Sequence, residues 1–321
     1  MNSKFMIGRG LRIVALAALT VVGSTTFLSA QIIGTAVDSS GNGRHGSFVE
    51  TGAPLWSEIP GVPLSGIGGN AVNRLGGTTS WVAVPATDDA AFGSTSFTFE
   101  AWLNAPDPNC TGACPGNYMV RGAWVSTDTV NPGVSATFAQ HSGGNISAGP
   151  NGGCCGQQVV AFGYPAPAPG WHHVVHTFED NGDGTSTTSV YFDGVAAGPP
   201  MLVDGAADPV NNIPRDDSDF GLAIGILPFA GDNTQNVVYA NPIQGFTGGY
   251  DEFAYYDTAL SASQVSDHFA AASGAAGAYK AAVLADNPAG YWQFESIPEP
   301  GSVILLVMGL LSICGLARRR S

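Results

Sequence analysis

The stretch WHHVVHTFEDNGDGTSTTSVYFDGV, residues 171–195, decides the fold. Its runs 174–178 and 189–193 are rich in β-branched and aromatic side chains, which is typical of strands. Between the two runs, residues 179–184 are a cluster of acidic, Asn and Gly turn formers. A second turn, Asp-Gly at 193–194, ends the second run. The stretch therefore predicts two antiparallel strands joined by a polar turn.

Composition and periodicity favour an all-β sandwich around this hairpin. The 321 residues include 44 Gly and 21 Pro, and only 11% are charged, which indicates many turns and few long helices. Residues 95–103, TSFTFEAWL, alternate as a half-buried strand does. One face of that strand carries Phe97, Phe99, Ala101 and Leu103, and the other carries Ser96, Thr98, Glu100 and Trp102. We interpret Glu100 as a charge on the outer face of the sheet rather than as a catalytic group.

The charge is uneven along the chain. The formal net charge is −14, but three cations lie near the start and three at the end. Residues 31–297 hold five Lys or Arg against 24 Asp or Glu, a net of −19. Such a surface repels nucleic acid and anionic glycans and is compatible with cation binding, although solubility alone also explains it. We therefore expect no nucleic-acid partner.

Four motifs in order give the chain a family resemblance. The pattern WHHV…VYFDGV, the strand FTFEAW at 97–102, the turn DSSGNG at 38–43 and the segment GYDEF at 249–253 together resemble the laminin-G-like, concanavalin A-like jelly-roll family. The resemblance implies a two-sheet antiparallel jelly-roll sandwich, which we place at residues 31–274. One short helix is predicted after Ser261, where Ser261 and Gln264 form a capping box. We also expect apolar helices at the two termini.

The resemblance implies a calcium site at the first turn. Asp38, Asn42 and nearby carbonyl groups offer oxygen ligands, and members of the family place this turn beside the strand that contains Asp251. We therefore predict one structural calcium ion at these three residues. A tight turn that uses Asn and Gly for positive φ, without an ion, is the alternative.

The histidines of the central hairpin do not predict a metal site. His172 and His173 point to opposite faces of the predicted strand, and His172 and His176 lie roughly 13 Å apart along it. Because His176 shares a face with Val174 and Phe178, we expect it to be partly buried against the sheet.

Four cysteines lie in one irregular, loop-rich region: Cys110, Cys114, Cys154 and Cys155. In an oxidising compartment an even set in long loops predicts two disulfides, whose pairing the sequence leaves open. A four-thiolate zinc site is the alternative, although adjacent Cys154 and Cys155 are poorly spaced for it.

Both termini carry the pattern of sorting segments. Residues 1–30 combine a cationic start, an apolar run and small residues near Ala30, which predicts a secretory signal peptide; an uncleaved anchor is the alternative. Residues 297–321 hold Pro298-Glu299-Pro300, an apolar run at 303–317 and the basic end Arg318-Arg319-Arg320, and this order resembles the bacterial PEP-CTERM signal.

That second resemblance implies a partner and a location. An exosortase-type processing enzyme reads the signal, the apolar run anchors the chain in the membrane transiently, and the protein reaches the cell envelope or extracellular surface. The run has 15 residues, which is short for a lone spanning helix. A simple tail anchor is the alternative.

The segment 275–296 contains a misplaced family element. The stretch from Tyr279 to Trp292 resembles the one that opens the domain in other members of the family, yet here it comes last. We predict a strand at 289–295 that fills the missing first position beside residues 32–37, with Trp292 and Phe294 on one face. The alternative is a loose stalk left from a second, truncated domain.

No catalytic motif was found in the sequence. It has neither the Glu-x-Asp-x-x-Glu strand of jelly-roll glucanases nor a nucleophile elbow, a zinc-protease helix motif or a phosphate loop. We therefore expect a non-catalytic module that binds glycan or a surface partner. A structural surface protein without a ligand and an unrecognised polysaccharide hydrolase are the alternatives.

Overall fold

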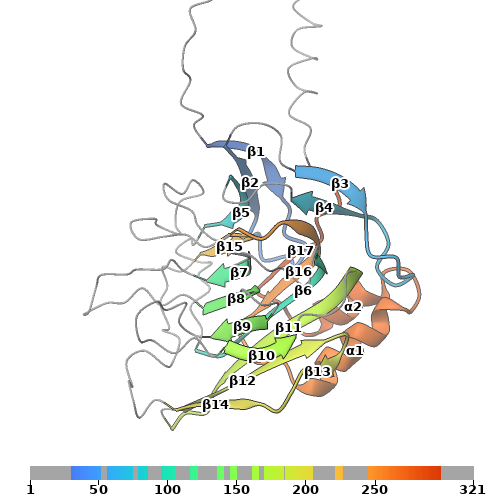
Figure 1. Cartoon of the computed structure of the whole chain (residues 1–321). Helices are drawn as coiled ribbons and strands as arrows, with labels where there is room; N and C mark the ends of the chain where they lie inside the picture. Colours follow the sequence, from blue (N-terminus) through green and yellow to red (C-terminus); the bar gives the residue numbers. More distant parts are fainter. Residues whose placement is uncertain are drawn as a thin grey trace, which may run out of the picture.

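The computed structural model describes residues 30–51, 56–74, 79–85, 95–105, 116–121, 136–140, 145–149, 161–165, 170–183, 185–204, 221–226 and 245–297. In these ranges strands dominate, and they form two sheets in which every pairing is antiparallel (Figure 1). The architecture agrees with the predicted jelly-roll sandwich.

The first sheet has eight strands. In spatial order they are β1 (Gln31–Ala36), β2 (Gly46–Glu50), β5 (Ser80–Val84), β15 (Leu222–Ile224), β7 (Gly116–Arg121), β8 (Ala136–Gln140), β9 (Asn145–Gly149) and β10 (Ala161–Pro165). Strand β1 therefore lies at one edge of this sheet.

The second sheet has nine strands. In spatial order seven of them are β13 (Val195–Ala196), β12 (Thr185–Phe192), β11 (Gly170–Asp180), β6 (Phe97–Ala105), β16 (Gly248–Tyr256), β4 (Asn70–Arg74) and β3 (Trp56–Pro60). The remaining two, β14 (Met201–Asp204) and β17 (Gly290–Trp292), pair with β12 and β16.

The predicted hairpin is confirmed as part of the second sheet. Strands β11 and β12 pair from Val174↔Phe192 to Asp180↔Ser186. The other edge of β11 pairs with β6 over its whole length, with Phe178 opposite Phe97. The polar turn therefore joins β11 and β12 in this register.

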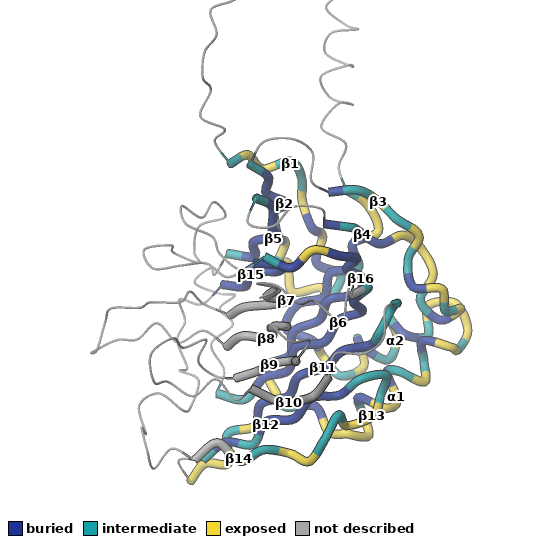
Figure 2. Tube along the Cα trace, in the orientation of Figure 1, coloured by how far each residue is buried: buried dark blue, intermediate teal, exposed yellow. Residues whose placement is uncertain are grey.

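The main core fills the space between the sheets. Phe48 and Val82 from the first sheet meet Phe97, Phe99 and Val174 from the second in one buried cluster. Phe97 and Phe99 of β6 and Val174 of β11 are the residues that alternation directs to this face, and Figure 2 shows both strands as largely buried. The predicted facing of β6 is thereby confirmed.

Two helices cover the other face of the second sheet, where the sequence predicted one. Helix α1 (Ala262–Ala272) begins at the predicted capping box of Ser261 and Gln264. Helix α2 (Ala278–Ala285) lies in the segment 275–296, where the sequence predicted only a strand at 289–295 and no helix. Its sequence AYKAAVLA has high helix propensity, and the pair Tyr279 and Val283 is fully buried.

The C-terminal segment closes the sandwich. Strand β17 pairs with β16, with Trp292 opposite Phe253, and Trp292 also bridges to Asp38 just after β1. The amide of Ser39 donates to the carbonyl oxygen of Tyr291 at 2.6 Å. The segment therefore lies between β16 and the end of β1, with direct pairing at Asp38 and Ser39 rather than along 32–37. Trp292 and Phe294 belong to the core between the sheets, while Tyr291 faces the helices, as the alternation predicted.

Within the described ranges no helix is long and apolar enough to cross a membrane. The predicted signal peptide, the four cysteines, the Pro-Glu-Pro motif, the apolar run at 303–317 and the terminal arginines all lie outside those ranges.

Candidate functional site

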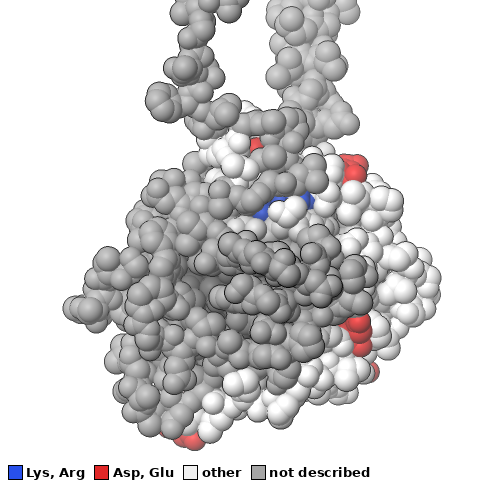
Figure 3. All heavy atoms as spheres, viewed as in Figure 1, with Lys and Arg blue, Asp and Glu red and all other residues white. Residues whose placement is uncertain are grey.

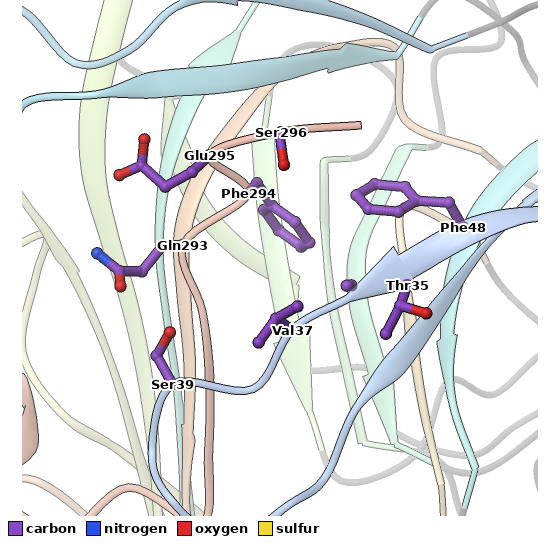
Figure 4. Close-up of a pocket in the computed structure, with 9 residues that line it drawn as sticks. Thr35, Val37, Ser39, Phe48, Gln293, Phe294, Glu295 and Ser296 are labelled. Carbon is purple, nitrogen blue, oxygen red and sulfur yellow. The ribbon is translucent and has the colours of Figure 1, made fainter. Parts of the chain in front are cut away.

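A small hollow lies where the two ends of the domain meet. It has a volume of about 150 Å³ and is lined by nine residues (Figure 4). We call it the seam pocket. Its lining comprises Thr35, Ala36, Val37, Ser39 and Phe48 from the N-terminal end and Gln293, Phe294, Glu295 and Ser296 from the C-terminal end.

The pocket lies beside the contact between the C-terminal segment and the turn that follows β1. The bridge between Asp38 and Trp292 holds the two segments together at one point, and the chain beyond Trp292 then runs beside β1 across a gap. Phe294, whose φ is +55°, turns its ring into the core, 5.8 Å from the ring of Phe48. The floor is therefore aromatic.

The walls of the seam pocket are polar and partly exposed. Thr35 and Ser296 are exposed, and their hydroxyl groups lie on opposite sides of the gap (Figure 4). The side chain of Val37 is 61% exposed between them. The pocket therefore combines a buried aromatic floor with a partly exposed polar rim.

The Asp38 turn forms the base of the seam. The carboxylate of Asp38 accepts hydrogen bonds from the Ser40 amide and hydroxyl, the Arg44 amide and the Tyr291 amide, at 2.9 to 3.0 Å. Burial raises the pKa of Asp38, but these bonds outweigh it and hold the pKa below its ordinary value. The side chain of Asn42 donates to the carbonyl oxygens of Pro288 and Ala289.

This arrangement does not resemble a calcium site. Both carboxylate oxygens of Asp38 already accept N–H or O–H donors, and the amide of Asn42 points its nitrogen at the backbone. Among the described residues no three His, Cys, Asp or Glu side chains are grouped as a metal ion requires. Calcium at Asp38, Asn42 and Asp251 stays a prediction, and the turn is satisfied without an ion.

Two buried carboxyl groups lie on the far side of the C-terminal segment. Asp251 and Glu252 on β16 are at most 1% exposed. One oxygen of Asp251 accepts from the Val62 amide, and Tyr291 and Gln293 donate to Glu252. Burial and the neighbouring charge of Glu252 raise the pKa of Asp251 well above its ordinary value, and burial raises the pKa of Glu252 to about 7.

Glu100 is not an outer-face charge, and that interpretation was wrong. It is 1% exposed, because α1 and α2 cover its face of the sheet. Its carboxylate accepts hydrogen bonds from the hydroxyls of Tyr256 and Tyr279 and from His173 Nε2, each at 2.8 Å. Such a fully bonded carboxylate binds the helices to the sheet and offers no oxygen to a substrate.

His268 completes the Glu100 cluster. Its Nδ1 lies 3.1 Å from both Glu100 oxygens, and its Nε2 lies 2.9 Å from Asp286. Both ring nitrogens face carboxylates, so the ring is satisfied when both are protonated. Burial lowers the pKa of His268, but the charge and hydrogen bond of Glu100 outweigh it and raise the pKa above its ordinary value. Burial alone would raise the pKa of Glu100. The charge of His268 and the hydrogen bonds from His268 and His173 outweigh burial and hold that pKa far below its usual range.

The hairpin histidines are structural. His172 pairs with Asp193 at 2.7 Å, and His173 donates to Glu100. His176 is fully buried and bonds the hydroxyl of Thr188, so its predicted partial burial was an underestimate. Burial lowers the pKa of His176 to about 3. The three histidines therefore do not meet: His172 bonds Asp193, His173 bonds Glu100 and His176 bonds Thr188.

The described part of one face of the molecule carries few charges. Figure 3 shows one face, in which the described atoms are mostly neutral, with scattered acidic groups and a small basic spot. Glu58 and Glu295, which are both exposed, lie near the seam: Glu58 accepts from the amide of Ile297, and Glu295 accepts from the amide of Asn70. The rim of the seam pocket is therefore neutral to acidic.

Comparison with known proteins places the chain in a family. The sequence profile described as the concanavalin A-like lectin/glucanases superfamily matches residues 76–266, which is more than half of the chain. The chain belongs to the concanavalin A-like lectin/glucanase superfamily. No curated protein matches the sequence significantly. The superfamily assignment confirms the predicted resemblance in its fold.

The solved structures that match resemble the chain only distantly. A heptameric SAP-like pentraxin from Limulus polyphemus has a TM-score of 0.34 and 16% identity, over 54% of this chain and 69% of that chain. The CBM40 of a Ruminococcus gnavus IT-sialidase, bound to α2,6-sialyllactose, has a TM-score of 0.35 and 10% identity, over 56% and 85%. The enzymatically active domain of bacteriophage CBA120 tailspike protein 2 gives 0.45 and 14%, over 76% and 33%, so the chain spans a third of that domain. These likenesses carry no argument about activity.

Proposed function

We propose that the protein is a non-catalytic glycan-binding module of the cell envelope that takes one neutral sugar unit in the seam pocket. The observation that carries the proposal is the lining of the pocket: Phe48 and Phe294, which are 0% and 5% exposed, lie beneath it, and the exposed residues Thr35 and Ser296 carry hydroxyl groups at its rim. Sugars present hydroxyl edges, which can exchange hydrogen bonds with such a rim. The volume of about 150 Å³ suits a single unit of a longer chain rather than a whole oligosaccharide.

Burial of the acidic groups favours binding over hydrolysis. Glycosidases need two carboxyl groups that reach the scissile bond from opposite sides. Glu100, Asp251 and Glu252 are each at most 1% exposed and are bound to tyrosine, histidine or backbone groups. We therefore assign no catalytic role to these three carboxyl groups, which all lie in the described part of the chain.

A glycan screen with a pocket-filling variant tests the function. Thr35→Trp places a large side chain in the seam pocket from an exposed edge position, so the core stays intact. Ile32→Trp is the matched control, because Ile32 is 54% exposed on the same strand and does not line the pocket. We expect the wild type and Ile32→Trp to retain the same glycan and Thr35→Trp to lose it. If both variants retained the glycan equally, the glycan-binding site would lie outside the seam pocket.

A structural role is the second candidate. The described chain begins next to β1 and ends at Ile297, whose amide donates to Glu58 of β3, and β1 and β3 lie at the same end of the molecule (Figure 1). A domain held by both ends on one side suits display on a surface. Wild-type protein that retains no neutral glycan from a broad array would favour this candidate.

Export and sorting are part of the proposal. The signal peptide at 1–30 and the PEP-CTERM pattern of 297–321 support delivery to the envelope through an exosortase-type enzyme. Replacing residues 298–300 with alanine should leave an uncleaved, membrane-retained protein in the native host. An unchanged mature mass and unchanged surface display would show that the motif is not read.

A further inference from the structure

We propose that the outer face of the second sheet carries a further glycan-binding surface, which takes an extended neutral sugar chain across five neighbouring strands. Its residues follow one another in a single line across those strands: Trp171, Asn104, Gly249, Asn73 and Ser57. We call this line the amide row. The inference rests on the proposed function only for the class of ligand, because none of these residues lines the seam pocket.

The register of the sheet produces the amide row. Trp171 of β11 lies opposite Asn104 of β6, and Asn104 lies opposite Gly249 of β16. Gly249 lies opposite Asn73 of β4, which lies opposite Ser57 of β3. These strands are neighbours in the order β11, β6, β16, β4 and β3 (Figure 1). Since neighbouring strands lie about 4.8 Å apart, the row is about 19 Å long and offers contacts to several successive units of a linear chain.

Alternation turns the row away from the core between the sheets. Tyr250 and Val72 belong to that core. Gly249 and Asn73 are their neighbours in the chain, and successive residues of a strand point to opposite faces. The row therefore lies on the outer face of the sheet, the face that the two helices cover in part.

The helix cover ends beside the amide row. Trp102 and His173 are at most 2% exposed, and both stack on the ring of Phe269 of α1. Asn104 and Trp171, on the same strands and the same face, are partly exposed. The row is therefore the part of this outer face that a ligand reaches without moving a helix.

The centre of the row is an aromatic surface that lies flat on the sheet. A Cβ atom on Gly249 would lie 2.9 Å from Cη2 of Trp171 and 3.1 Å from Cδ1 of Ile59. The indole of Trp171 therefore reaches across β6 to β16 and occupies the place of a side chain at position 249. One edge of Trp171 packs against the helix-covered cluster, and the residue stays partly exposed. Sugars present apolar C–H faces that pack on such a ring.

Polar side chains flank the indole. Asn104, Asn73 and Ser57 are partly exposed, and among the residues that the structure describes none of these three side chains has a hydrogen-bond partner. A side-chain amide offers two donors and an acceptor oxygen, and a hydroxyl group both donates and accepts. The row therefore presents unused hydrogen-bonding groups on both sides of a ring, which matches the hydroxyl edges of a sugar chain.

Charge and strand pairing decide which ligand the row suits. None of its five residues is charged, and residues 31–297 carry a net charge of −19, which repels anionic sugars and nucleic acid. The carboxylate of Glu58, next to Ser57 in the chain, accepts from the amide of Ile297. Strands β6, β16 and β4 are paired on both sides, so a peptide cannot add to them as a further strand. A neutral sugar chain is the ligand that fits these conditions.

Binding of neutral hexasaccharides to the full protein tests the amide row. The probes are cellohexaose, laminarihexaose, xylohexaose and mannohexaose, and a galacturonate hexamer is the anionic comparison. Asn104→Ala and Asn73→Ala remove side chains that have no partner in the described structure, so the fold stays intact. Gln31→Ala is the matched control, because Gln31 is an exposed amide on β1 of the first sheet and lies outside both sites.

We expect the wild type and Gln31→Ala to bind at least one neutral hexasaccharide equally, and each asparagine variant to bind it about fivefold more weakly. The dissociation constant should fall from the disaccharide to the hexasaccharide, because a longer chain fills more of the row. Unchanged affinity in both asparagine variants would overturn the proposal. Equal affinity for the disaccharide and the hexasaccharide, equal affinity for the galacturonate hexamer, or no binding of any neutral probe by the wild type would also overturn it.

Trp171 gives a direct readout of the contact. Of the tryptophans that the structure describes, Trp171 alone is not buried. A sugar that covers its ring should therefore shift the tryptophan emission to shorter wavelength. Trp171→Phe keeps an aromatic ring at this position and should remove the shift and weaken binding. A shift of the same size in Trp171→Phe would place the ligand elsewhere and overturn the proposal.

The seam-pocket variant Thr35→Trp separates the two proposals. A hexasaccharide that Thr35→Trp binds normally and Asn104→Ala binds more weakly supports the amide row and removes the seam pocket as the site of that glycan. A glycan that Thr35→Trp loses and Asn104→Ala binds normally leaves the proposed function standing and overturns the amide row.

Discussion

Glu100→Gln is the most informative single substitution in this domain. It keeps the size of the side chain and removes the charge that four donors share: Tyr256, Tyr279, His173 and His268. Breaking one partner of a buried ion pair costs about 3–5 kcal/mol, because the remaining charge loses its compensation. We therefore expect the free energy of unfolding to fall by about that amount.

The size of the loss follows from the geometry of the cluster. His268 also faces Asp286, whose side chain is 24% exposed and screened by solvent, so Asp286 replaces only part of the lost interaction. Removing a single donor should cost less: Tyr279→Phe leaves three donors on Glu100, and about 1 kcal/mol is expected. Glu58→Gln is the matched control, and it should change stability by less than about 0.5 kcal/mol.

Urea denaturation followed by circular dichroism measures these differences, and the pH adds a second test. The pKa of His268 is raised in the folded protein above its ordinary value of 6.5. The stability that protonated His268 contributes is therefore fully present below pH 6.5 and is lost as the pH rises through the raised pKa. The cost of Glu100→Gln should therefore be larger at about pH 6 than at about pH 9. A cost no larger than that of Glu58→Gln would refute a charged cluster.

Other predictions follow from single sites. Trp292→Ala should cost about 3–5 kcal/mol in urea unfolding, against little change for the exposed control Val37→Ala; an unmoved midpoint would mean that the C-terminal segment is a stalk. The pKa of His176, lowered to about 3 from 6.5, predicts that stability is lost as the pH falls from 6.5 towards 3, by up to about 5 kcal/mol, and His176→Gln should flatten that part of the curve. If calcium binds the native protein at Asp38, Asn42 and Asp251, the melting temperature should be higher in millimolar calcium than in chelator, and coinciding melting curves would remove that prediction. Thiol counting on the denatured, unreduced exported protein should find none of the four loop cysteines reactive, and four reactive thiols would exclude disulfides.

Local patterns in the sequence predicted the sheet framework well. The hairpin at 171–195 and the alternation of β6 depend on neighbours within a few residues, and the structure has them as expected. The capping box at Ser261 is equally local. Helix α2 was missed because the family resemblance suggested a strand or linker there, although the run AYKAAVLA was itself a helix signal.

The buried acidic clusters could not be predicted from such patterns. Alternation placed Glu100 on the correct face of β6, but its partners His268 and Tyr279 are 168 and 179 residues away. Only Trp102, apolar and on the same face, signalled that this face is covered. The seam pocket was missed for the same reason, since it depends on how the C-terminal segment meets the turn that follows β1.

The contact between Tyr291 and Asp38 joins residues 253 apart in the sequence, nearly the full span of the domain. Closing so long a loop costs entropy before any contact repays it, and folds dominated by distant pairings form slowly. A growing or translocating chain cannot place its last strand until almost all of it has emerged. Until then β16 lacks its β17 partner, and the Asp38 turn lacks the amide that satisfies it. Assembly of this domain therefore ends at the seam, and a chain truncated before residue 290 keeps an open sheet edge that can pair with other chains.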